Sequence, residues 1–155
     1  MKMVRSRDLP WGEALNRGSY GQRRKGLGGE KLSCSLFELQ PGKRSFPFHA
    51  HHLTEEALYV ISGCARVRTP DGITDIGPGD FVCFPAGGQA HQLINDGAEP
   101  MVYLAMSAGV GLDVVEYPDS GKVACAVGKP PGGKRLVFRE ASQVDYFDGE
   151  KDAER

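Results

Sequence analysis

Histidine is the residue type whose placement in this 155-residue chain points most clearly to chemistry. All four histidines lie between positions 49 and 91, and three fall within Phe48-His49-Ala50-His51-His52. Residues two apart on a β-strand project from the same face, so His49 and His51 would present two imidazoles side by side, while His52 points the opposite way. Two neighbouring imidazoles are half of a metal site.

Carboxylates and a further histidine are available to complete such a site. Glu55 and Glu56 follow the histidine pair and precede the turn Ser62-Gly63, so a strand here would bring a carboxylate back to the imidazoles. His91 is the remaining histidine and would come from a distant strand. A single strand histidine is more often a hydrogen-bonded structural residue, but three of them with a carboxylate favour metal binding over that alternative.

The elements that must position these residues have the pattern of short β-strands. Runs rich in β-branched and aromatic residues alternate with turn sequences, and no segment has a sustained 3.6-residue apolar period. The pattern predicts an all-β sandwich or barrel. Its expected strands are Ser33–Leu39, Glu56–Ile61, Cys64–Arg68, Ile73–Ile76, Phe81–Phe84, Ala90–Ile94, Met101–Met106, Leu112–Tyr117, Lys122–Val127 and Arg135–Phe138.

The two ends of the chain differ from this central pattern of residues 33–128. Residues 1–32 combine a short helical turn around Pro10–Leu15 with a basic, glycine-rich stretch, Arg23–Gly29, and we expect an arm followed by a solvated basic loop. Binding of an anionic ligand by this loop is the less favoured alternative. Residues 129–155 form a polar extension, whose last part we expect to dock as a short helical turn and then fray.

Composition and charge exclude several classes of protein. Nineteen Lys and Arg against 20 Asp and Glu give a formal net charge of −1, so we expect neither nucleic acid nor an anionic membrane as a partner. No apolar run approaches the roughly 20 residues of a membrane span, and the first residues lack the apolar stretch of a secretory signal. We therefore expect a cytoplasmic protein. The cysteines, expected to be buried free thiols, are Cys34, Cys64, Cys83 and Cys125.

Two stretches of the chain resemble the sequence motifs of the cupin superfamily. Residues 41–63, PGKRSFPFHAHHLTEEALYVISG, contain the glycine, the His-x-His pair, the glutamate after four residues and the glycine after six more. Residues 79–95, GDFVCFPAGGQAHQLIN, contain the glycine, the Pro-x-Gly, the histidine and the asparagine of the second motif. One extra residue precedes His49 and another precedes His91. The whole chain is also similar to an uncharacterised bacterial group of single-domain cupins.

The resemblance implies a double-stranded β-helix, the cupin jelly-roll barrel, and strand-like segments before Leu36 and after Leu112 predict extra strands at both ends. Among the two neighbouring glutamates it selects Glu56, which stands five residues after His51 and seven before Gly63. Three neutral imidazoles and a carboxylate suit Mn²⁺, Fe²⁺, Ni²⁺, Cu²⁺ or Zn²⁺, and an open coordination position would admit an oxygen-bearing substrate. The metal ligands that the resemblance implies are His49, His51, Glu56 and His91.

Strand alternation predicts which side chains share the interior with these ligands, and the resulting pocket is largely apolar. Either face of Met101–Met106 is an acceptable core face. The nearest candidates for an acid–base group are Glu38, Glu55 and Cys83. The side chains expected to face inward are Phe37, Leu39, Leu58, Val60, Gln89 and Leu93.

Three functions are compatible with these features. The leading hypothesis is a metalloenzyme of the oxygenase, decarboxylase or isomerase type, acting on an oxygenated small molecule. The second is a non-catalytic module that binds a small ligand or a metal, because the fold alone does not decide between them. The third is a closed, stabilising metal site, which predicts no cavity. Strand-like segments at both ends exceed what the barrel needs, and since sheet edges are usually covered, we expect a homodimer.

Overall fold

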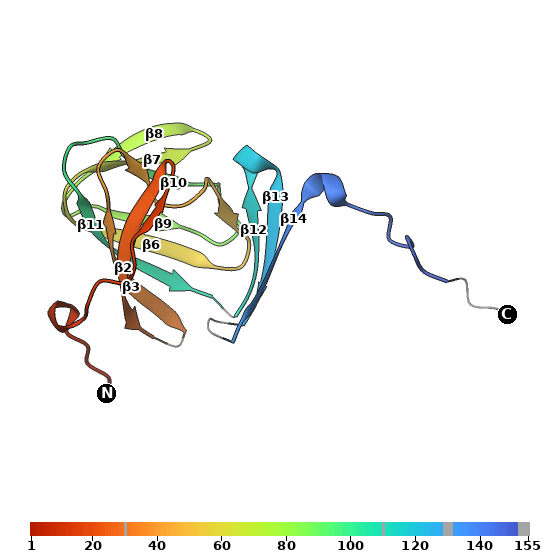
Figure 1. Ribbon diagram of the computed structural model, residues 1–155, viewed down its shortest axis with the longest axis horizontal. Coiled ribbons are helices and arrows are strands. Elements are labelled where there is room, and N and C mark those ends of the chain that lie inside the picture. Colours follow the sequence, from red (N-terminus) through yellow and green to blue (C-terminus); the bar gives the residue numbers. More distant parts are fainter. Residues whose placement is uncertain (30, 110, 129–131, 152–155) are drawn as a thin grey trace.

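The computed structural model describes residues 1–29, 31–109, 111–128 and 132–151, and it is built almost entirely of β-strands, as predicted (Figure 1). Three short 3₁₀ turns, η1 (Ser6–Asp8), η2 (Pro118–Ser120) and η3 (Glu140–Ser142), accompany them in these ranges. The strands of the described residues are β1 (Leu15–Arg17), β2 (Tyr20–Gly28), β3 (Leu32–Leu39), β4 (Lys43–Arg44), β5 (Ala50–His51), β6 (Glu55–Ser62), β7 (Ala65–Thr69), β8 (Gly72–Ile76), β9 (Phe81–Phe84), β10 (Gln92–Asn95), β11 (Met101–Ala108), β12 (Leu112–Tyr117), β13 (Lys122–Val127) and β14 (Lys134–Arg139).

A strongly curled sheet forms the body of the molecule, and a smaller sheet lies beside it (Figure 1). The curled sheet is hydrogen-bonded in the order β8-β7-β10-β4-β2-β3-β11-β6-β9, with β1 paired to β2. The smaller sheet has the order β14-β13-β12-β5. Strands are therefore added to the barrel at both ends of the chain, at β1 and β2 and at β12 to β14, as the strand-like segments at both ends predicted.

The hydrophobic core lies on the inner face of the curled sheet. Phe37 on β3, Tyr103 on β11 and Val60 on β6 stand side by side in register, and each is at most 7% exposed. The face of β11 that carries Met101 and Tyr103 is the buried one, which settles the choice that alternation left open. Of the other side chains expected to face inward, three are confirmed as buried: Leu39, Leu58 and Leu93.

The basic stretch of the N-terminal segment is not the loop that we expected. Through Gly28 it belongs to β2, which pairs with both β1 and β3. Arg23 donates two hydrogen bonds, of 2.8 and 3.0 Å, to the Glu38 carboxylate of β3. Pairing of this stretch with β3 outweighs a composition that is typical of loops. The expected turn around Pro10–Leu15 is also wrong, because the helical turn is η1 and Leu15 begins β1.

Two further expectations for side chains are wrong. The expected helical turn of the C-terminal extension is η3, but Tyr146 and Phe147 are 88% and 71% exposed, so the segment after it does not dock and projects away from the sheets (Figure 1). Two apolar side chains among polar neighbours bury too little surface to hold it. The four thiols are free as expected, but Cys64 and Cys83 are exposed because they lie on outward-facing positions.

In the described part of the chain, no helix has the length and the apolar character needed to cross a membrane.

Candidate metal centre

Backbone pairing brings the predicted ligands together from separate segments. His49 and His91 stand opposite each other in an isolated antiparallel bridge, in which each N–H donates to the carbonyl of the other at 3.2 and 2.8 Å. His51 lies two residues further along, on β5, which pairs with β12. Glu56 is the second residue of β6. The rings of His49 and His91 are consequently adjacent, with centroids 4.6 Å apart.

One carboxylate oxygen lies at the centre of the three imidazoles. Oε2 of Glu56 is 3.6 Å from Nε2 of His49, 3.4 Å from Nε2 of His51 and 3.3 Å from Nε2 of His91. Atoms bound at about 2.1 Å to one transition-metal ion lie roughly 3.0–3.5 Å from one another. In His49, His51 and Glu56 the candidate ligand atoms all lie within 4.8 Å of one another, so this group could hold a metal ion.

Hydrogen bonds at Nδ1 fix the orientation of two of the imidazole rings. His49 donates from Nδ1 to the carbonyl oxygen of Pro47 at 2.8 Å, and His51 donates from Nδ1 to Oδ2 of Asp113 at 2.5 Å. Each bond places the proton on Nδ1 and leaves the lone pair of Nε2 directed at Glu56. His91 is held differently, by stacking on Phe84 with ring centroids 3.7 Å apart.

The electrostatic surroundings favour the protonation states that bind metal ions. Burial raises the pKa of Glu56, but the neighbouring imidazoles of His49, His91 and His51 lower it by more, so its pKa lies well below its usual range. Burial is the main cause that lowers the pKa of His91. At neutral pH the cluster therefore offers a charged carboxylate together with a neutral imidazole at His91.

Asp113 is the residue of this site that the sequence analysis missed. It lies on the inward face of β12 and is 7% exposed, and its second oxygen accepts a hydrogen bond from the N–H of Leu53 at 3.0 Å. Burial raises the pKa of Asp113, whereas hydrogen bonds from His51 and Leu53 lower it by more, so the carboxylate stays charged. The available signal was its position two residues before buried Val115, which puts an acidic side chain on the inward face of a strand.

The neighbouring polar residues are excluded from the site by strand alternation. His52 points away, as predicted, and its Nε2 lies 2.8 Å from Oε1 of Glu116 at the surface. None of the three proposed acid–base candidates reaches the cluster, because Glu55 and Cys83 are exposed and Glu38 is bound to Arg23. Gln89 is also exposed rather than inward, since residues 85–90 are not a strand and alternation does not apply to them.

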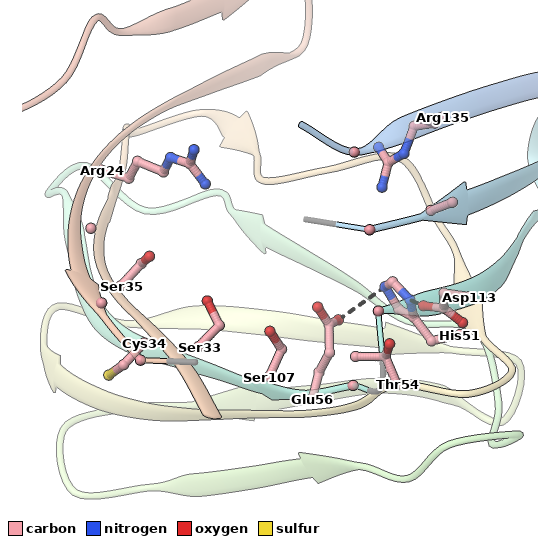
Figure 2. Close-up of a pocket in the computed structure, with 18 of the residues that line it drawn as sticks. Arg24, Ser33, Cys34, Ser35, His51, Thr54, Glu56, Ser107, Asp113 and Arg135 are labelled. Carbon is pink, nitrogen blue, oxygen red and sulfur yellow. Dashed lines mark hydrogen bonds and ion pairs between the residues drawn. The ribbon is translucent and has the colours of Figure 1, made fainter. Parts of the chain in front are cut away.

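A cavity of about 1070 Å³ opens beside the cluster, between the two sheets (Figure 2). This cavity contradicts the expectation of a closed, purely stabilising site. His51, Glu56 and Asp113 line one end of it. Three serines of the curled sheet also line it, and so do basic side chains of β2 and β14. These lining residues are Ser33, Ser35, Ser107, Arg24, Lys25, Lys134 and Arg135.

Comparison with known proteins finds a cupin domain in this chain. The family model described as the cupin domain matches residues 35–107, which run from β3 into β11 and include the histidine cluster. This match shows a cupin domain over these residues, and the curled sheet, like that of the similar solved structures, is a double-stranded β-helix. A search of curated protein sequences found no match.

Solved structures of similar fold extend over most of the chain. A proposed sugar phosphate isomerase from Acidithiobacillus ferrooxidans is 28% identical, with a TM-score of 0.78, over 92% of this chain and 95% of the other. A sugar phosphate isomerase from Silicibacter pomeroyi is 20% identical, with a TM-score of 0.79, over 95% and 98%. A predicted oxalate decarboxylase from Thermotoga maritima is 21% identical, with a TM-score of 0.63, over 70% and 100%.

Proposed function

We propose that this protein is a divalent-metal-dependent enzyme of the isomerase type that acts on a small oxygenated substrate. In this proposal His49, His51, Glu56 and His91 hold the ion. The observation that carries it is the position of Glu56 Oε2, within 3.6 Å of the Nε2 atoms of all three histidines and at the edge of a cavity.

The donor set fits a transition metal. Three imidazole nitrogens and one carboxylate oxygen suit Mn²⁺, Fe²⁺, Ni²⁺, Cu²⁺ or Zn²⁺, whereas Ca²⁺ prefers more oxygen ligands. A bound ion would polarise a carbonyl or hydroxyl oxygen of the substrate. The chain itself supplies orientation: Pro47 and Asp113 fix two imidazoles, and the serines of the cavity offer hydroxyl groups to a hydroxylated ligand.

The isomerase type is favoured over the oxygenase and decarboxylase types by the comparisons. The relative with 28% identity over nearly the whole chain is a proposed sugar phosphate isomerase, whereas the predicted oxalate decarboxylase is 21% identical and supports the fold only. Isomerisation of a hydroxycarbonyl compound moves a proton between neighbouring carbons and consumes no oxidant. A metal ion beside a hydroxyl-lined cavity suits this chemistry.

A metal-content measurement tests the site. The purified protein, His51→Ala and His52→Ala would be dialysed against Mn²⁺ or Zn²⁺ and analysed for bound metal. We expect about one ion per chain in the wild type and in His52→Ala, and loss of most metal in His51→Ala. Equal losses of metal in both variants would contradict the assignment of ligands. In a second experiment, the metal-loaded wild-type protein would be assayed for conversion of aldose and ketose pairs.

One observation favours a second candidate function, a non-catalytic binding module. Among the described residues that line the cavity the carboxylates are Glu56 and Asp113, and both are engaged with histidines. No further carboxylate of these lining residues is available as a general base. A protein that binds ligand and metal but converts no substrate of a broad hydroxycarbonyl panel would be such a module.

A further inference from the structure

Two arginines enter the cavity from different sheets. Figure 2 shows Arg24 and Arg135 projecting into the cavity from its two walls, above the level of Glu56. The register of the strands explains why both arginine side chains point into the cavity. Arg24 of β2 stands opposite Phe37, which faces the interior, and Arg135 of β14 stands opposite Ala126 of β13, which stands opposite Asp113 of β12. Both guanidinium groups are thus on the inward faces of their sheets.

These two guanidinium groups have no anionic partner among the described residues. Four other arginines do: Arg7 pairs with Asp8, Arg23 with Glu38, Arg66 with Asp96 and Arg68 with Asp119. The neighbouring Lys25 is turned to the other side of β2, where its Nζ donates to the carbonyl oxygen of Ser6 and lies over the ring of Trp11. Among the described arginines, Arg24 and Arg135 therefore line the cavity without an anionic partner, and Lys134 of β14 lines it as well.

The charged groups that line the cavity favour an anionic ligand. Its two described carboxylates, Glu56 and Asp113, are already engaged with histidines. A divalent ion held by neutral imidazoles and one carboxylate would add a further positive charge. A guanidinium group offers a planar pair of N–H donors that matches the oxygens of a phosphate, and it keeps its charge at any working pH.

A row of hydroxyl groups lies between the arginine of β2 and the metal centre. Ser33, Ser107 and Glu56 are consecutive in register across β3, β11 and β6, so their side chains share the inner face. Ser35 stands two residues along β3 from Ser33, on the same face and nearer to Arg24 (Figure 2). This spacing suits a ligand that carries hydroxyl groups between an oxygen at the metal centre and an anionic end.

We infer that Arg24 and Arg135 bind the phosphate of a phosphorylated, polyhydroxylated small molecule whose opposite end lies at the metal centre. The placement of that opposite end rests on the function proposed above. The serines hydrogen-bond the hydroxyl groups between the two ends, and the phosphate end is selected by the two unpaired guanidinium groups.

The test compares two ligands that differ only in the phosphate. Binding of D-glucitol 6-phosphate and of D-glucitol to the Mn²⁺-loaded protein would be measured by isothermal titration calorimetry. We expect the phosphorylated polyol to bind at least about tenfold more tightly, and Arg24→Ala and Arg135→Ala each to weaken its binding by about tenfold. The matched controls are Arg23→Ala, on the opposite face of β2, and Arg139→Ala, at the far end of β14, and both should bind like the wild type.

Several results would overturn the inference. Equal affinity for the two polyols would remove the phosphate subsite, and wild-type affinity in both Arg24→Ala and Arg135→Ala would place that subsite elsewhere. Binding of D-gluconate as tight as that of the phosphate would contradict the choice of phosphate. The metal-free protein separates this inference from the proposed function: arginine-dependent preference for the phosphate that survives metal removal supports the subsite, even where metal analysis refutes the metalloenzyme.

Discussion

At the scale of single residues, two adjacent histidines each have a carboxylate partner, but only one of the two pairs lies inside the molecule. His51 is bonded to Asp113 inside the molecule, and His52 is bonded to Glu116 at the surface. The two carboxylates lie three residues apart on β12, on opposite faces. A carboxylate that holds a metal-binding imidazole raises its basicity and fixes its ring, whereas the surface pair has no such task.

Replacing Asp113 should therefore weaken metal binding without removing a ligand. We expect Asp113→Asn to lower the affinity for Mn²⁺ or Zn²⁺ by roughly 10–100-fold, because His51 loses the acceptor that orients it. The control is Glu116→Gln, which removes the equivalent partner of His52 and should leave the affinity unchanged. Competition with a metal-sensitive dye measures both, and an unaltered affinity in Asp113→Asn would contradict the role assigned to this residue.

At the scale of elements, β6 joins the metal centre to the core through strand alternation. Glu56, Leu58 and Val60 point inward, so the same strand face supplies the carboxylate and two core residues, of which Leu58 is 3% exposed. Tyr59 and Ile61 point outward and are 43% and 49% exposed. Packing of the inward face holds the Glu56 carboxylate in place against the histidines.

Replacing an inward or an outward side chain of β6 by alanine should lower the free energy of unfolding by very different amounts. We expect Leu58→Ala to lower the free energy of unfolding by about 2–5 kcal/mol, because it leaves a void in a packed core. Ile61→Ala should change it by about 0.5 kcal/mol or less, since that side chain is half exposed. Chemical denaturation with urea measures both values. Similar losses would show that the outer face of β6 is buried in solution, as it would be in an interface.

At the scale of the whole molecule, the smaller sheet ends in a strand whose outer side is open. β14 is the edge of the order β14-β13-β12-β5, and its side chains are exposed along its whole length. Leu136, Val137 and Phe138 are 42%, 52% and 50% exposed. Unprotected apolar edge strands are usually covered by another strand or another chain.

We predict a homodimer that buries β14 of each chain. Sedimentation equilibrium at micromolar concentration should give twice the chain mass, and Val137→Lys should shift it towards the monomer, because a charge would be buried in the interface. Val144→Lys is the matched control, since Val144 lies in the C-terminal extension and is 66% exposed. A wild-type protein that sediments as a monomer would refute the prediction.

Metal binding should also stabilise the whole fold in a pH-dependent way. The pKa of His91 is lower in the folded protein than its ordinary value of 6.5, so the unfolded chain binds more protons as the pH falls below this value. Protons also compete with the metal for imidazole nitrogens. Stability and metal affinity should therefore both decline from pH 7.5 to pH 5.

Thermal unfolding checks this expectation. At pH 7.5, metal at a hundredfold excess over its Kd should raise the Tm by roughly 5–10 °C, and the increment should shrink towards pH 5. His52→Ala should behave like the wild type. If added metal leaves the Tm unchanged at both pH values, the prediction of a metal site in this protein is wrong.

Local pattern alone determined most strands of the barrel and the inward faces of β3 and β6. Alternation of apolar and polar residues has a fixed period of two, and His49 and His51 share a face for the same reason that Leu58 and Val60 do. The spacing of the two cupin motifs then selected Glu56 and His91 among the available carboxylates and histidines. These features are short-range, so the sequence carries them in full.

Only the tertiary structure determined which strands and which side chains pair with one another. The basic residues of β2 have the composition of a loop. They form a strand because folding places β3 beside them, where Glu38 pairs with Arg23. Asp113 reaches His51 from 62 residues away through the pairing of β12 with β5. Arg24 and Arg135 meet one cavity because two sheets close on each other, and no local pattern encodes the contact of segments so distant in the chain.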